Sequence, residues 1–215
     1  MRRDDMPGQA RSGARVAVYI DGFNLYFGLK SQGLRRYYWL DVHLWATRFL
    51  KPGQQLVGVD YFTADISGPS AKHRRQQTFL DALATHTSVR IIRGHYLVKE
   101  RQCRVCGTVN LIPEEEKTDS AISARMVADA FTDRCDVAFV VSGDSDLSPP
   151  IEIVRQHLPE KRILVAFPPG RSSNELRRHA HGSFYINEPA LRASQLPDVV
   201  TKANGHKLRR PKRWC

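Results

Sequence analysis

Three uninterrupted apolar segments of five residues constrain the fold of this chain most strongly. They are VAVYI (16–20), VAFVV (137–141) and ILVAF (163–167), and each is bounded by polar or turn-forming residues. Strands that are buried on both faces of a parallel sheet have this continuous apolar pattern. Two longer segments, 56–64 and 89–98, carry more polar positions and indicate strands nearer an edge. The sequence therefore predicts a sheet of five strands.

Helical segments separate these strands along the chain. Their expected ranges are 23–32, 41–50, 70–86, 119–133 and 149–158. The alternation of strand and helix predicts an α/β fold with three layers, α/β/α, around a central and mainly parallel sheet. In such folds the ligand crevice lies at the carboxyl ends of the strands.

Length and composition indicate how the chain is organised. Its 215 residues, of which 41% are hydrophobic and 26% charged, suit one folded domain. We expect a flexible N-terminal extension over 1–14, the domain over 15–196 and a flexible basic tail over 197–215. The longest apolar runs have five residues and the ~20 needed to span a bilayer are not reached, so we expect no membrane partner.

The charge balance favours a polyanionic partner. Lys and Arg number 33 against 22 Asp and Glu, which gives a net charge of +11 at pH 7. Nucleic acid binding explains this excess, and a solvated basic surface explains it equally well. The four cysteines form no disulfide framework and the N-terminus lacks a secretory apolar stretch, so we expect a reducing, cytoplasmic location.

Aspartates directly follow two of the predicted buried strands. Asp21 comes after VAVYI, and Asp144 and Asp146 come after VAFVV. Because the carboxyl ends of parallel strands share one edge of the sheet, these side chains should lie together. Asp119 opens the helix that leads into VAFVV and is a fourth candidate for the same crevice. Taken singly, each acid also has a structural explanation as a turn residue or helix cap.

Carboxylates that gather in one crevice repel one another, and a divalent cation relieves this repulsion. Mg²⁺ or Mn²⁺ accepts hard oxygen ligands and keeps several waters, which leaves room for phosphate oxygens. Such an ion lowers the pKa of a bound water and neutralises charge on a phosphodiester under attack. The four acids could hold one ion or two. Their pattern predicts metal-dependent hydrolysis of a phosphodiester.

Several segments resemble motifs of the NYN domain, in the LabA-like branch of the PIN-like metal-dependent nucleases. The similar segments are YIDGFNL (19–25), EEKTDSAISARMVADA (115–130), FVVSGDSDLSPPIE (139–152) and PPGRSSNEL (168–176), the last followed by FYI (184–186). The likeness runs from about Arg15 to Arg192. It implies a PIN-like fold and Mg²⁺- or Mn²⁺-dependent cleavage of RNA.

The resemblance also implies roles for individual residues. The metal-binding and catalytic acids would be Asp21, Asp119, Asp144 and Asp146. Asn24 would lie at the rim of the site, and Ser142 and Ser145 would orient a ligand or phosphate through their hydroxyls. One departure is that relatives often have an acid where this chain has His181-Gly182-Ser183.

Other residues extend or complicate this interpretation. Lys117 and Arg171 are candidates for phosphate contacts. Cys103 and Cys106 form a CxxC pair in an excursion over 99–116, and such a pair suits a structural zinc ion. Two further zinc ligands are missing from the motif, so a free thiol pair is the alternative.

The leading interpretation is an endoribonuclease that cleaves single-stranded RNA. A catalytically weak RNA-binding or partner-recruiting module of the same fold is an alternative, and a small-molecule phosphatase is a second. The sequence leaves the RNA target and the oligomeric state open, a homo-oligomer included.

Overall fold

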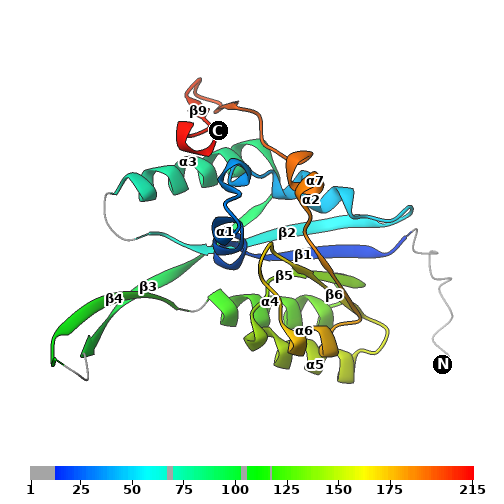
Figure 1. The fold of residues 1–215 in the computed structure, drawn as a ribbon. Coiled ribbons are helices and arrows are strands. Elements are labelled where there is room, and N and C mark those ends of the chain that lie inside the picture. The colour runs from blue at the N-terminus through cyan, green and yellow to red at the C-terminus, as the bar shows by residue number, and fades with distance from the viewer. Residues whose placement is uncertain (1–12, 67–69, 103–105, 117) are drawn as a thin grey trace, which may run out of the picture.

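A mainly parallel sheet forms the centre of the molecule in the computed structural model, which describes residues 13–66, 70–102, 106–116 and 118–215 (Figure 1). In spatial order its strands are β4 (Val109–Glu116), β3 (Arg90–Gln102), β2 (Gln55–Ala64), β1 (Arg15–Asp21), β5 (Val137–Val141), β6 (Arg162–Phe167) and β7 (Gly182–Tyr185). Neighbouring strands run parallel except for the antiparallel β3–β4 pair. The predicted fold class is confirmed, but the predicted number of five strands is wrong, because β7 continues the parallel part to six strands and β4 adds an antiparallel edge.

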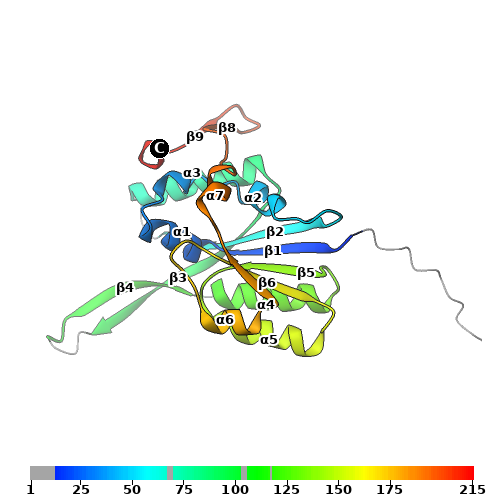
Figure 2. The same cartoon turned by 45° about the vertical axis from the view of Figure 1, so that its right-hand side comes forward.

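The two additional strands have weak sequence signals. β7 contains only the four residues GSFY, too few to show a clear alternation. β4 contains Pro113 and three consecutive glutamates, which are depleted in strands, although proline is tolerated at a sheet edge. β3 and β4 form a hairpin that extends away from the body of the molecule (Figures 1 and 2). The described part of the excursion expected over 99–116 holds the last four residues of β3 and all of β4.

Helices cover both faces of the sheet, as the three-layer prediction requires (Figure 2). One face carries α1 (Gly22–Ser31), α2 (Val42–Arg48), α3 (Ala71–His86) and α7 (Glu188–Arg192), and the other carries α4 (Thr118–Phe131), α5 (Ser148–His157) and α6 (Asn174–His179). Short polar side chains begin the helices: the amide of Leu44 donates to Asp41, which caps α2. Within the described ranges, no helix has both the length and the apolar character needed to cross a membrane.

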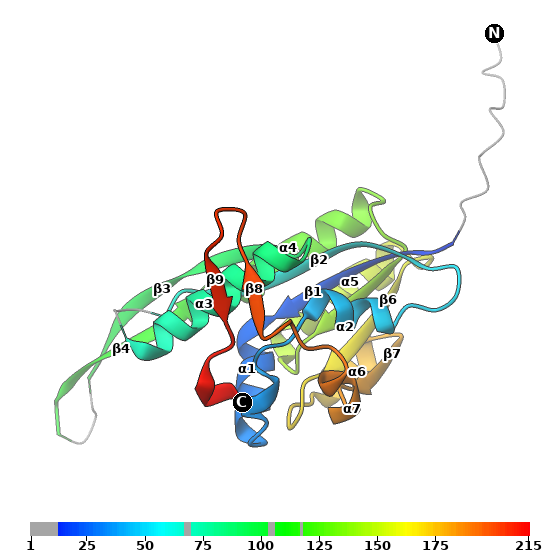
Figure 3. The same cartoon turned by 90° about the horizontal axis from the view of Figure 1, so that it is seen from above.

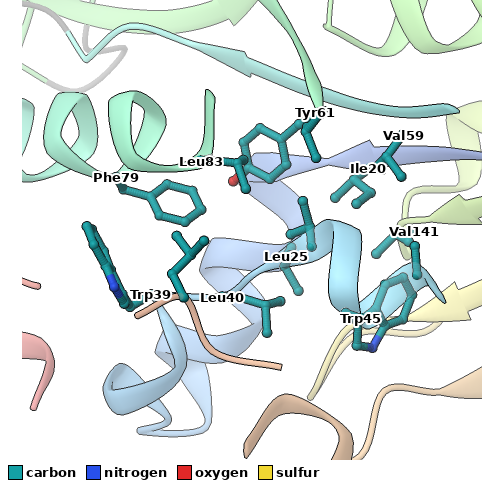
Figure 4. Close-up of a cluster of buried hydrophobic side chains, with 14 of the residues drawn as sticks. Ile20, Leu25, Trp39, Leu40, Trp45, Val59, Tyr61, Phe79, Leu83 and Val141 are labelled. Carbon is teal, nitrogen blue, oxygen red and sulfur yellow. The ribbon is translucent and has the colours of Figure 1, made fainter. Parts of the chain in front are cut away.

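The central strand β1 contributes side chains to two hydrophobic cores. Val16, Val18 and Ile20 pack into the core beneath α1, α2 and α3, whereas Ala17 and Tyr19 pack into the core beneath α4 and α5. Figure 4 shows part of the first core, where side chains such as Phe79 and Leu83 of α3 meet side chains of the sheet. Because both faces of β1 are covered, its sequence is apolar throughout.

The segment 197–215 packs on the helical layer that contains α1, α2, α3 and α7, although we expected a flexible tail from its composition. β8 (Val199–Thr201) and β9 (Lys207–Arg209) form an antiparallel hairpin, and the 3₁₀ helix η3 (Lys212–Trp214) follows it (Figure 3). Trp214 is buried, and its ring centroid lies 5.5 Å from that of Tyr38. Basic residues surround single buried apolar residues in this segment, so its composition hides the packing.

An ion-pair cluster joins the start of β1 to the turn before β5. Nε of Arg15 donates to Oδ2 of Asp136 at 3.0 Å, and Nη2 donates to Oδ1 of Asp136 at 2.8 Å. Nη2 also donates to Asp133 at 2.7 Å. These hydrogen bonds from Arg15 hold the pKa of Asp136 well below its usual range.

We expect Asp136→Asn to lower the free energy of unfolding by about 2 kcal/mol at neutral pH. A lowered carboxyl pKa stabilises the folded state above the unfolded pKa of ~3.9, and this contribution is lost as the pH falls toward the folded pKa. The difference from wild type, measured by urea unfolding, should therefore be full at pH 7 and shrink below about pH 4. Asp198→Asn is the control, because that carboxylate is 80% exposed and lies 3.5 Å from Arg210. A difference that does not change with pH would contradict the assignment.

Candidate metal-binding and active site

The order of the parallel strands reverses between β1 and β5. From β1 the chain proceeds to β2 and β3 on one side, and then returns to β5, β6 and β7 on the other. Ligands of open parallel sheets bind at such a reversal, outside the carboxyl ends of the strands. Asp21 is the last residue of β1, and Asp144 lies three residues beyond the end of β5. The topology therefore brings these two acids to the position where a ligand is expected.

A pocket at this position is lined by all four predicted aspartates, and we term it the acidic pocket. Its cavity volume is about 840 Å³. The four aspartates come from three places in the fold. Asp21 precedes α1, Asp119 lies in the first turn of α4, and Asp144 and Asp146 lie at the start of the 3₁₀ helix η2 (Ser145–Leu147). Residues distant in the chain thus converge on one cavity.

Hydrogen bonds fix Asp21 within the pocket wall. Asp21 is only 5% exposed. Its Oδ1 accepts a hydrogen bond of 2.9 Å from the backbone amide of Asn24, and this bond caps α1. Its Oδ2 accepts from the Ser142 hydroxyl at 3.0 Å. The Ser142 hydroxyl also accepts from the Asp144 amide at 3.1 Å. Ser142 therefore joins the carboxyl ends of β1 and β5.

Burial and mutual repulsion disfavour the charged forms of these acids. Burial raises the pKa of Asp21 to about 6, with the Asn24 and Ser142 hydrogen bonds opposing the rise and the charges of Asp119 and Asp144 adding to it. The pKa of Asp119 is raised by burial and then by the charges of Asp144 and Asp146. A bound cation would favour the ionised carboxylates and relieve this repulsion.

The donor atoms of the acidic pocket fit a hard divalent cation, but they are not a preformed ligand cage. Carboxylate oxygens are the ligands that Mg²⁺ and Mn²⁺ prefer. In the described part of the chain, however, no three His, Cys, Asp or Glu side chains are grouped closely enough to hold a metal ion. Mg²⁺ usually takes one or two carboxylates and keeps several waters, so a spread set of acids still suits it.

The other predicted site residues have different positions. Asn24 lines the acidic pocket, and its Oδ1 accepts from the Gly143 amide at 3.0 Å. Arg171 also lines the pocket and is exposed. Ser142 is fully buried and does not line the pocket, and its hydroxyl donates to Asp21. Ser145 is exposed on η2 and does not line the pocket.

The remaining predicted residues concern the linker before α4 and the proposed zinc site. Lys117 and Cys103 lie outside the described residues. Cys106 is exposed, and its Sγ lies 3.2 Å from the hydroxyl oxygen of Thr108. The structure therefore describes one of the two cysteines proposed for zinc.

Sequence reasoning missed an aromatic wall and several hydroxyls in the acidic pocket. Phe23 and Phe27 line it from α1, with their ring centroids 6.1 Å apart. Ser123 lines it from α4, four residues after Asp119. Residues at positions i and i+4 share one face of a helix. The spacing of Phe23 and Phe27 in α1, and of Asp119 and Ser123 in α4, could therefore have identified these wall residues from the sequence.

The fold and sequence resemble known proteins. A solved protein of unknown function from Vibrio parahaemolyticus RIMD 2210633 has a TM-score of 0.59 and 19% identity, covering 84% of this chain and 97% of that chain, which shows a shared fold. The 6-hydroxy-3-succinoylpyridine 3-monooxygenase HspA of Pseudomonas putida (strain DSM 28022 / S16) is 28% identical over 231 residues, covering 86% of this chain and 71% of the relative. The family model of the NYN domain matches residues 15–188. The chain therefore belongs to the NYN domain family.

Proposed function

We propose that this protein is a metal-dependent endoribonuclease that cleaves single-stranded RNA by attack of water on a phosphodiester. The observation that carries the proposal is the single pocket lined by Asp21, Asp119, Asp144 and Asp146 at the reversal of strand order. Membership of the NYN family supports it, because NYN domains are generally nucleases. Assignment to the LabA-like branch is part of the same proposal.

The four aspartates would hold Mg²⁺ or Mn²⁺ in this proposal. When bound, the ion would lower the pKa of a water ligand and neutralise charge on the scissile phosphate. The Ser142 hydroxyl donates to Asp21 and accepts from the Asp144 amide, so it links the last residue of β1 to the segment that follows β5. These hydrogen bonds would hold the Asp21 carboxylate in position whether or not a cation is bound.

The rest of the acidic pocket would position the RNA. Arg171 is exposed on the wall and would donate to phosphate oxygens. Gly143 lets the segment that carries Arg171 approach closely, because a Cβ at Gly143 would lie 2.9 Å from the Cβ of Arg171. The rings of Phe23 and Phe27 offer surface for unpaired bases, which favours a single-stranded substrate.

Cleavage should require a divalent metal. We expect no product from labelled single-stranded RNA in the presence of EDTA, and product after excess Mg²⁺ or Mn²⁺ is added. Double-stranded RNA and single-stranded DNA of the same sequence serve as comparators for substrate class. Cleavage at an unchanged rate in EDTA would contradict the mechanism. RNA that binds without product under any ion would favour the alternative of a non-cleaving RNA-binding module.

The name of the Pseudomonas putida relative describes a different reaction for that protein, on a pyridine derivative. The acidic pocket supports phosphodiester hydrolysis for this chain, because its carboxylates suit a hard cation and its Arg171 suits phosphate. A small aromatic acid is nevertheless a useful comparator in the binding experiments below.

A further inference from the structure

A second cavity lies beside the acidic pocket, in the helical layer that contains α1 and α3. It is enclosed by α1, α3, the 3₁₀ helix η1 (Arg35–Tyr37) and η3, and its volume is about 280 Å³. Phe23 lines this cavity as well as the acidic pocket, so the two share a wall. We term the second cavity the aromatic pocket.

The aromatic pocket combines flat rings with positive charge. Its rings include those of Phe23, Tyr26, Tyr38, Tyr61, Phe79 and Trp214. Its cations are Lys30, Arg35, Lys72, Arg75 and Arg213. No Asp or Glu is among the described residues that line it, and within the described chain none of these five cations forms an ion pair with a carboxylate. This composition is complementary to an anion that carries an aromatic ring.

Tyr38, which lines the aromatic pocket, has a buried hydroxyl that lacks a well-formed hydrogen bond within the described part of the chain. Tyr38 is 9% exposed, and its hydroxyl forms no hydrogen bond of normal geometry with the described residues. Burial, with a smaller contribution from the neighbouring Tyr26, raises the pKa of Tyr38 to about 12, so the hydroxyl keeps its proton. A buried hydroxyl without a well-formed hydrogen bond is costly, and a polar ligand atom would satisfy it.

We propose that the aromatic pocket binds one nucleotide of the RNA substrate, with the base against the rings and a phosphate on the cations. The proposal rests on the proposed function and deepens it. Bases stack on aromatic side chains, and Lys and Arg bind phosphate regardless of sequence. A cavity of about 280 Å³ lies just below the usual range of ~300–1,000 Å³ for ligand pockets, which suits one nucleotide rather than a longer segment.

The shared wall favours a nucleotide over a free aromatic acid. An RNA chain with its scissile phosphate among the aspartates passes Phe23, and the adjoining nucleotide then meets the aromatic pocket. A small aromatic acid would have the ring and the anion but no reason to lie beside the acidic pocket.

Calorimetric titration tests the proposal. The full-length protein is titrated with AMP and UMP in EDTA, so that metal binding does not contribute, and with benzoate and inorganic phosphate as comparators. Arg75→Ala changes a half-buried cation of the pocket, and Lys72→Ala changes an exposed one, so at least the second variant should fold. Arg48→Ala is the matched control, because Arg48 is exposed on α2 and lines neither pocket.

We expect a nucleoside monophosphate to bind more tightly than phosphate or benzoate, and both pocket variants to weaken that binding ten-fold or more. Arg48→Ala should leave it unchanged, and Arg75→Ala should raise the KM for RNA more than it lowers kcat. Equal nucleotide binding by wild type and both pocket variants would overturn the proposal, as would tighter binding of benzoate. If the protein binds AMP in a way that depends on Arg75 but cleaves no RNA, the proposed nuclease function is refuted and the nucleotide site is not. If it cleaves RNA but binds no nucleotide, the proposed nucleotide site is refuted and the nuclease function is not.

Discussion

Asp144→Asn should reduce RNA cleavage by about 100-fold or more. Asparagine has the same shape as aspartate but no charge, so the acidic pocket loses one anionic ligand for a cation. The substitution keeps an amide oxygen that can still accept from the Asp146 amide, a hydrogen bond of 3.1 Å that caps η2. The local backbone should therefore survive while the electrostatics change.

The stability of the variant separates a chemical effect from unfolding. The charge of Asp144 raises the pKa values of both Asp21 and Asp119, so its removal relieves repulsion and should not destabilise the fold. Glu160→Gln is the matched control, because it makes the same type of change at an exposed acid outside the acidic pocket. Single-turnover cleavage and urea unfolding of both variants provide the measurements. Undiminished cleavage by Asp144→Asn would remove the aspartates from the mechanism.

Trp214→Ala should lower the free energy of unfolding by about 3 kcal/mol, as for other large buried aromatic residues. Trp214 is 8% exposed although it is the penultimate residue of the chain. Its ring lies 5.5 Å from the ring of Tyr38, 6.3 Å from that of Trp39 and 6.4 Å from that of Phe79, measured between centroids. Removing the indole leaves a cavity among these rings and releases η3 from the core.

The neighbouring residue provides the control for this prediction. Lys212→Ala removes an exposed basic side chain from the same 3₁₀ helix and should change stability by less than about 0.5 kcal/mol. Urea unfolding followed by circular dichroism gives both values, since tryptophan fluorescence changes with the substitution itself. If Trp214→Ala unfolds at the wild-type urea concentration, the segment 197–215 does not contribute to the folded core.

The sequence predicted well those elements whose signal lies within a few consecutive residues. VAVYI, VAFVV and ILVAF are apolar at every position because both faces of their strands are covered, and all three are strands of the parallel sheet. β7 and β4 were missed because the first is very short and the second has residues untypical of strands. The packing of Trp214 was hidden by the basic residues around it.

The sequence by itself determined which acids could meet, because the carboxyl end of every parallel strand lies at the same edge of the sheet. Only the tertiary structure decided how they are held: the order of strands placed β1 beside β5, and this contact lets the hydroxyl of Ser142 bind Asp21. The aromatic pocket likewise exists only after folding, since its rings come from positions as distant as Phe23 and Trp214. Local patterns specify strands and helices, whereas a contact between distant residues depends on the packing of the whole chain.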